Sequence, residues 1–180
     1  ANNNLIWFGE QHWSNVSNYF VSSGYFNKSE TTITENFAAN VNGKTQALRV
    51  VTLSGNTESG VTGAYAGMRI QGRSFPAGTY TISLAVKSNT GSAQTMGMLC
   101  NGGTISGDLA VTTAWARVSY TITHPGGSPL LYFCINGSAG TAMDILIDEL
   151  KMEPGSSATP YVTPKFDANF GIDGTVEARD

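Results

Sequence analysis

YTISLAVK, residues 80–87, alternates large apolar side chains with small or polar ones. Because successive side chains of a strand point to opposite faces, the even-numbered residues share an apolar face and the odd-numbered ones lie opposite. Residues 117–123 repeat the pattern, and their apolar face is formed by Val118, Tyr120 and Ile122. A period of two in both places predicts strands with one face on a core and the other in solvent.

Further strand-like stretches flank these two, and turn sequences separate them. The stretches cover residues 31–37, 45–53, 64–75, 93–100, 130–136 and 142–152. The turns contain PAG at 76–78, NTG at 89–91 and PGG at 125–127, whose residues fix φ or tolerate positive φ. The one helical element that we expect is a single turn at residues 11–19. Short strands at this spacing predict an all-β sandwich or barrel.

Composition limits the classes of function. The chain has 180 residues, which suits one domain, and 13% of them are charged, against about 25% in an average domain. Gly, Ser, Thr and Asn make up the difference, a balance typical of β-rich extracellular or virion domains. A net charge of −3 without a basic stripe predicts no nucleic-acid partner. No apolar run approaches about 18 residues, so we expect no membrane insertion.

The organisation of the chain changes near residue 153. EPGSSATPYVTP, residues 153–164, contains three prolines and no alternation, which is typical of an extended segment. We therefore predict a β-sandwich module at residues 1–153 and an extended, Pro-containing C-terminal exit segment at 154–180. We expect residues 165–180 to leave the sandwich or to pair with another chain. Because the sequence starts at Ala1 rather than Met, we expect a processed product or a piece of a longer chain.

Catalytic groups are scarce. His12 and His124 are the only histidines, and no Ser, Cys or Asp is spaced to suggest a triad. No Gly-rich loop that could hold a phosphate leads into a helix. Two carboxylates would hydrolyse a glycoside only if they faced each other about 5–10 Å apart, and most of those present are predicted to be solvated. The candidates are Glu10, Glu30, Glu35, Asp108, Asp144, Asp148 and Glu149. We expect that the protein is not an enzyme.

Ligand recognition has a better candidate. A sugar-binding face needs aromatic rings that stack on the sugar and polar groups that bond its hydroxyls. Tyr65, Arg69, Gln71 and Arg73 share one face of a predicted strand, and Trp13 is a further aromatic candidate. The alternative interpretation of this row is a plain solvent-facing strand. Three other aromatic residues lie on or beside apolar faces and are assigned to the core: Tyr80, Trp115 and Tyr120.

The sequence leaves two structural cross-links undecided, a calcium site and a disulfide. Calcium takes six to eight oxygen ligands, and Glu10 and Asp148 could converge on one ion if the first and last strands are neighbours. The alternative is an acidic surface without an ion. Cys100 and Cys134 both lie in strand-like runs. They are either buried free thiols or a disulfide, because spacing alone does not decide between these states.

Several motifs together resemble a known family. In order along the chain they are NLI at 4–6, AGTYTIS at 77–83, WARVSYTI at 115–122, ILIDELKME at 145–153 and PGSSATPY at 154–161. The order is similar to that of the carbohydrate-binding-module-like jelly rolls of bacteriophage tail-fibre and related virion proteins. The resemblance spans roughly residues 4–164. Its most specific part is the ending, which in that family recurs where a module hands the chain on to the next fibre segment.

The resemblance implies a two-sheet antiparallel β-sandwich that assembles with other virion chains, often as a trimer. It also implies a structural calcium held by acidic residues at the positions of Glu10 and Asp148. One departure from the family pattern is Trp7-Phe8, which replaces a more usual Pro/Asn-Gly stretch.

The function that we predict is a non-catalytic structural and adhesion module of a virion, in a phage fibre or appendage, that contacts host surface glycans. Two alternatives remain open. One is a purely architectural spacer or decoration protein. The other is an accessory carbohydrate-binding module of a secreted bacterial glycoside hydrolase, which would place the chain among secreted bacterial proteins.

Overall fold

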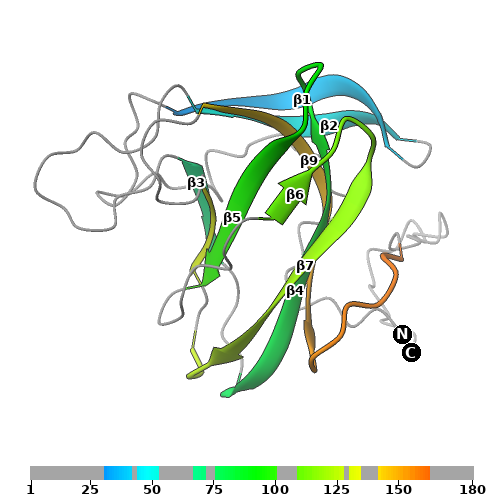
Figure 1. Cartoon of the computed structure of the whole chain (residues 1–180). Helices are drawn as coiled ribbons and strands as arrows, with labels where there is room; N and C mark the ends of the chain where they lie inside the picture. The colour runs from blue at the N-terminus through cyan, green and yellow to red at the C-terminus, as the bar shows by residue number, and fades with distance from the viewer. Residues whose placement is uncertain are drawn as a thin grey trace, which may run out of the picture.

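The computed structural model describes residues 31–41, 44–52, 67–71, 76–100, 109–127, 130–134 and 142–162. Within these ranges lie nine strands and no helix (Figure 1). The strands are β1 (Thr31–Val41), β2 (Lys44–Thr52), β3 (Gly67–Gln71), β4 (Gly78–Ser88), β5 (Gln94–Cys100), β6 (Leu109–Val111), β7 (Ala116–His124), β8 (Leu130–Cys134) and β9 (Met143–Pro154). One antiparallel sheet has the order β1-β2-β9-β4-β7 and the other the order β3-β8-β5-β6. The predicted all-β, two-sheet antiparallel sandwich is confirmed.

The core lies between the two sheets and uses the apolar faces found in the sequence. The larger sheet contributes Leu48, Val50, Tyr80, Ile82, Leu84, Val86, Ile122, Met143, Ile145, Ile147, Leu150 and Met152, and the smaller one Met96, Met98 and Val111. Burying a large side chain of this kind stabilises the fold by about 1.5–3 kcal/mol. The buried Tyr80 hydroxyl donates to the carbonyl of Pro76 at 2.6 Å, and Tyr120 packs against the core. The assignment of both tyrosines to the core is confirmed.

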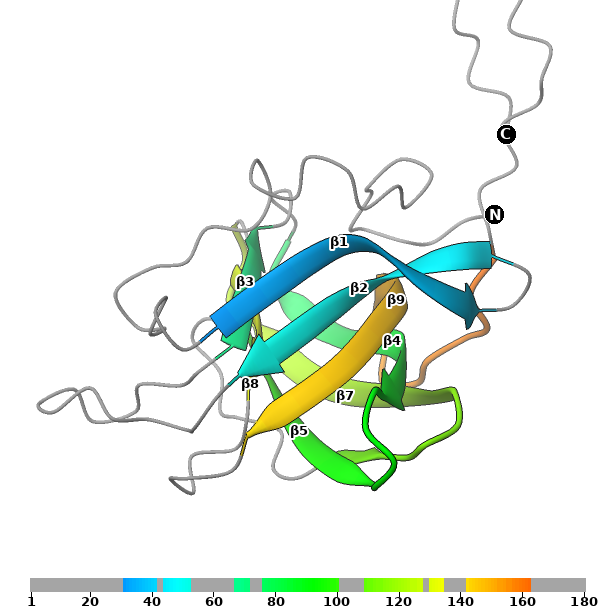
Figure 2. The same ribbon diagram turned by 90° about the horizontal axis from the view of Figure 1, so that it is seen from above.

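β9 is the central strand of the larger sheet and lies between β2 and β4 (Figure 2). Its residues 145–153 are buried on both faces of the sheet. The register between β9 and β4 shifts between Ser83 and Ala85, and Glu149 at this point has a φ of 52°. A bulge of this kind inserts one residue and twists the strand. Side chains of β9 opposite the core are therefore even-numbered before the bulge and odd-numbered after it.

The polar face of β4 differs from the prediction, because it is not in solvent. Thr81 and Ser83 are only 1% and 0% exposed. Residues 155–162, which we call the strap, continue from β9 and lie against this face; they form the last part of the orange trace in Figure 1. The Thr81 hydroxyl donates to the carbonyl of Gly155 at 2.8 Å. Alternation correctly located the strand, but it carries no information about a later segment that covers its polar face.

The pairing of β5 with β8 bears on the two cysteines. Cys134 lies opposite Gly97, whereas Cys100 lies opposite Leu131. The two cysteines are therefore offset by three residues, or roughly 10 Å along the strands. This exceeds the limit of about 7 Å between the Cα atoms of a disulfide. The register excludes a bridge between Cys100 and Cys134.

Each predicted strand-like stretch contains an observed strand, and one described strand was not predicted. β6 was not predicted, because its three residues are too few to show a period of two. The helical turn expected at residues 11–19 lies outside the described residues. No helix that the structure describes is long and apolar enough to cross a membrane.

Candidate functional site

The outer face of the larger sheet, which points away from the core, carries a second hydrophobic cluster. Its buried members are Val41, Ala47, Ala85 and Leu146, and the partly buried members packed against them are Phe37, Ala39 and Trp115. Four aliphatic side chains thus form the buried part of this cluster, while the two aromatic rings are left partly accessible. Trp115 was assigned to the core, and the structure instead places it in this second cluster, on the other side of the sheet.

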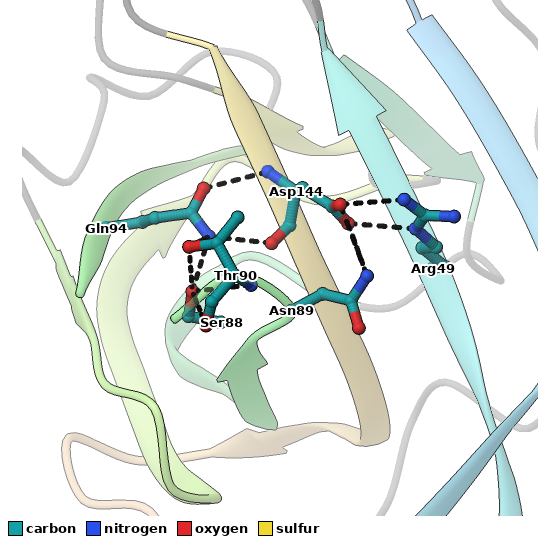
Figure 3. Close-up of polar contacts among 6 residues, drawn as sticks. All are labelled: Arg49, Ser88, Asn89, Thr90, Gln94 and Asp144. Carbon is teal, nitrogen blue, oxygen red and sulfur yellow. Dashed lines mark hydrogen bonds and ion pairs between the residues drawn. The ribbon is translucent and has the colours of Figure 1, made fainter. Parts of the chain in front are cut away.

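A polar cluster lies in the same sheet, where β2, β9 and the end of β4 run side by side (Figure 3). Arg49 donates from Nε and Nη2 to the two oxygens of Asp144, at 2.9 and 2.7 Å. The Asn89 amide also donates to both oxygens, at 3.1 and 3.2 Å. One residue of β2 and one of the β4–β5 turn therefore converge on the carboxylate of a β9 residue.

The electrostatics of this cluster follow from its hydrogen bonds. The Arg49 guanidinium and, to a lesser extent, the Asn89 amide hold the pKa of the Asp144 carboxyl below its ordinary value. In return, the carboxylate raises the pKa of Arg49. Both groups stay charged near neutral pH, and both remain partly accessible, with 31% of the Arg49 side chain and 21% of the Asp144 side chain exposed.

A second layer of hydrogen bonds holds Asp144 and Asn89 in place. Gln94 donates from Nε2 to the Asp144 carbonyl at 2.7 Å and accepts from the Asp144 amide at 2.8 Å. Gln94 also donates to the Ser88 hydroxyl at 2.6 Å. The backbone amide of Asn89 donates to the backbone carbonyl of Asp144 at 2.9 Å. The turn after β4 is thereby fixed to the start of β9, and the polar cluster is held without a ligand.

The Arg49 guanidinium also lies over the Phe37 ring, 5.1 Å from its centroid. We call Phe37, Arg49, Asn89, Trp115 and Asp144 the open half of the outer face. It combines aromatic rings with a cation, a carboxylate and an amide, all of them partly accessible. These are the groups that stack on a sugar ring and bond its hydroxyls.

The remainder of the outer face lies beneath the strap and is mostly buried. We call Thr81, Ser83, Arg117, Lys151 and Glu153 the covered half. Lys151 and Glu153 are paired at 2.9 Å with side chains only 5% and 3% exposed. Arg117 donates to the Ser83 hydroxyl at 2.8 Å, and the burial of Arg117 lowers its pKa. The Lys151–Glu153 pair is thus far less accessible than the Arg49–Asp144 pair, whereas the Arg117 side chain is 25% exposed.

The residues predicted from the sequence for ligand binding are only partly described. Arg69 and Gln71 lie in β3, opposite Tyr132 and Leu130 of β8. They therefore belong to the smaller sheet, apart from the open half. Three further predicted residues lie outside the described residues: Trp13, Tyr65 and Arg73. A binding row on β3 stays a prediction.

The predicted calcium site has one described member. Asp148 is 1% exposed, and its Oδ1 accepts from the Glu149 amide at 2.6 Å. Glu10 lies outside the described residues, and the described residues contain no group of three or more His, Cys, Asp or Glu that could hold a metal ion. A buried carboxylate fits a structural ion, but one donor does not build a site, so calcium stays a prediction. The expectation that most carboxylates are solvated is wrong for Asp148 and for Glu149, which is 7% exposed.

His124 has a structural role. It ends β7, is 1% exposed, and its Nδ1 accepts from the amide of Gly126 at 3.0 Å. Burial lowers its pKa, so the imidazole is neutral at pH 7. His124 thus shapes the turn that follows β7, while His12 lies outside the described residues.

Comparison with solved structures identifies the fold. The chain is similar to the CBM22-1 xylan-binding domain from Paenibacillus barcinonensis Xyn10C, with a TM-score of 0.54 and 17% identity over 88% of this chain and 99% of that one. It is similar to the CBM22-1-GH10 modules of Clostridium thermocellum Xyn10B, complexed with xylohexaose, with a TM-score of 0.55 and 14% identity over 82% of this chain and 27% of that one. The fold is that of a carbohydrate-binding module.

The expected phage family is not confirmed. The enzymatically active domain of bacteriophage CBA120 tailspike protein 4 overlaps with a TM-score of only 0.47 at 13% identity, which is too weak to support it. No protein-family model matches the sequence, and no curated protein matches it.

Proposed function

We propose that this chain is a non-catalytic glycan-binding module and that its binding surface is the open half of the outer face. One observation carries the proposal: Arg49, Asn89 and Asp144 form a fixed, partly accessible polar cluster beside the Phe37 ring. The carbohydrate-binding-module fold supports it independently of these residues.

The chemistry of binding follows from the groups present. The Asp144 carboxylate accepts from a sugar hydroxyl, while Arg49 and Asn89 donate to neighbouring hydroxyls. The Phe37 ring beside Arg49 covers the apolar C–H face of that sugar, while Trp115, at the opposite edge of the sheet, would contact another unit of the glycan. Because Gln94 and Ser88 already hold the cluster, little side-chain freedom is lost on binding. Binding at one such surface is weak, and repetition on a multimer would raise the avidity.

The biological setting that we propose is a phage fibre or comparable appendage, in which several copies contact glycans on a bacterial host. The closing motif of the sequence supports this setting. The similarity to xylanase modules supports the alternative, an accessory module of a secreted bacterial glycoside hydrolase. The third reading, an architectural spacer, predicts no glycan affinity at all.

The test is glycan-array binding of the full chain, displayed as a multimer, against bacterial surface glycans and xylo-oligosaccharides. Phe37→Ala and Arg49→Ala should each weaken binding about tenfold, from lost stacking or hydrogen bonding. Arg69→Ala, on the other sheet, should leave binding within about twofold. Binding to host glycans alone supports the virion setting, and binding to xylo-oligosaccharides alone supports the accessory module.

Two results would overturn the proposed surface. One is loss of binding in Arg69→Ala but not in Arg49→Ala, which would move the site to the row on β3. The other is no glycan binding by the wild-type multimer, which would leave the architectural role. Circular dichroism melts of the three variants control for loss of the fold.

A further inference from the structure

We propose that the strap, residues 155–162, is a latched junction: it makes the exit of the chain a rigid part of the sandwich, so that a segment attached after residue 162 takes a set direction relative to the two sheets. The polypeptide would then leave the module from the outer face and not from the end of β9. This proposal does not depend on glycan binding.

The first contact of the latch is the buried pair of Lys151 and Glu153, which lies beneath the strap. Glu153 accepts from the Thr159 amide through Oε1 and from the Thr159 hydroxyl through Oε2, both at 2.7 Å. Lys151 donates from Nζ to the same hydroxyl and to the carbonyl of Pro160 at 3.4 Å. The hydroxyl thus accepts from the ammonium and donates to the carboxylate, and each bond is strengthened by a full charge.

The strap is also held at its two ends. At the start, the Gly155 amide donates to the Thr79 carbonyl at 2.9 Å, and the Gly155 carbonyl accepts from the Thr81 hydroxyl at 2.8 Å. At the other end, the Arg117 guanidinium lies 5.8 Å from the centroid of the Tyr161 ring. These contacts span seven residues, Gly155 to Tyr161, and the first and last of them reach strands β4 and β7.

The energetics make the strap and the ion pair depend on each other. Taking two charges out of water is costly, and it is offset only where additional hydrogen bonds satisfy them. Here those bonds come from Thr159 and Pro160, so releasing the strap would leave Lys151 and Glu153 without them. Pro160 also restricts φ, which lowers the entropy lost when the strap is ordered.

These contacts account for the residue types found at the end of β9 and in the strap. The Lys and Glu form the pair, the Thr connects them to the strap, and the Tyr packs on Arg117. A flexible linker needs none of these contacts. The polar groups of this segment instead form hydrogen bonds with the sheet.

The test uses the full chain with Thr159→Val, which keeps the shape of the side chain and removes its hydroxyl. Ser157→Ala is the matched control, because Ser157 is exposed in the same segment. In the wild type we expect ¹⁵N order parameters of about 0.85 at residues 155–161, as in the strands. In Thr159→Val we expect them to fall below about 0.6 near residue 159, whereas Ser157→Ala and the amides of β4 should not change.

Chymotrypsin cleavage after Tyr161, followed by mass spectrometry, provides the second readout. The loss of a hydroxyl bonded to two charges should speed cleavage about tenfold or more in Thr159→Val, and Ser157→Ala should stay within about twofold of the wild type. Unchanged β4 amides show that the sandwich is folded in each variant. Low order parameters in the wild-type strap, or equal cleavage rates in the two variants, would overturn the proposal.

Discussion

The two halves of the outer face use the same chemistry at different depths. In the open half, Arg49 and Asp144 are 2.7 Å apart with side chains 31% and 21% exposed. In the covered half, Lys151 and Glu153 are 2.9 Å apart with side chains 5% and 3% exposed. The distances are nearly equal, so burial decides what each pair contributes.

The partly exposed pair retains contact with water, and its remaining hydrogen-bonding capacity is available to a ligand. The buried pair directs its bonds to the strap, and its contribution is to the position of the chain. On the two proposals, one face of one sheet combines a binding surface with a structural junction.

The largest expected effect comes from breaking the buried pair. Glu153→Ala leaves the Lys151 ammonium buried without its carboxylate, so the free energy of unfolding should fall by about 3–5 kcal/mol. Asp144→Ala leaves Arg49 partly in water and should cost about 1 kcal/mol. Urea unfolding followed by circular dichroism measures both.

A double variant sharpens this result. Lys151→Met with Glu153→Leu removes both charges and should recover most of the stability lost in Glu153→Ala, because a buried pair replaced by apolar side chains of similar size costs little. Equal losses in Glu153→Ala and Asp144→Ala would contradict the claim that depth separates the two halves.

The sequence predicted the strands well and the outer face poorly, for a physical reason. Alternation at residues 80–87 located β4 and its core-facing side chains, whereas the antiparallel arrangement was implied by the family resemblance. The same alternation assigned Thr81 and Ser83 to solvent, because a period of two reports which face a residue is on and not what covers that face. The covering strap comes some 75 positions later in the sequence, and no local pattern connects the two.

The candidate site shows the same limit. The residues of the open half come from β1, β2, the β4–β5 turn, the segment before β7 and β9. Single residues among them carry weak local signals: Asp144 was noticed as a carboxylate and Trp115 as an aromatic. Their convergence depends on the strand order β1-β2-β9-β4-β7, which the sequence did not provide. A row within one strand, such as Arg69 and Gln71, was visible because it needs no topology.

The next expected effect is on the pH dependence of stability. Burial raises the pKa of Glu153, but hydrogen bonds, chiefly from Thr159, lower it by more, so the pKa lies below its ordinary value in the fold. The pKa of Asp144 is lowered chiefly by its hydrogen bond with Arg49. A carboxyl with a lowered pKa binds fewer protons in the folded than in the unfolded state. Its contribution is therefore complete above the ordinary pKa, near 4, and is lost as the pH falls through the lowered value.

His124 adds a loss of stability with the same sign, which begins at a higher pH. Its pKa is lowered by burial, so the unfolded chain takes up a proton below about pH 6.5 before the folded chain does. Unfolding free energies measured from pH 7 to 3 should thus decline below pH 6.5 and more steeply below pH 5. Glu153→Gln should flatten the acid part of the curve more than Asp144→Asn, since only Glu153 is buried. Stability that rises as the pH falls from 6.5 to 5 would contradict this sign.

The smallest effect tests the backbone at the entrance to the covered half. Gly155 has a φ of +103°, a conformation that residues with a Cβ rarely adopt, although nothing lies within 4 Å of the added atom. Gly91, in the turn next to the open half, also has open space around its Cβ position but no such φ. Gly155→Ala should therefore cost about 1 kcal/mol of unfolding free energy through strain alone. Gly91→Ala should change it by less than about 0.5 kcal/mol or stabilise the fold slightly, because alanine restricts the unfolded chain.

Urea unfolding of the two variants side by side separates conformational strain from steric contact. Equal effects would mean that a Cβ at position 155 does not strain the turn into the strap.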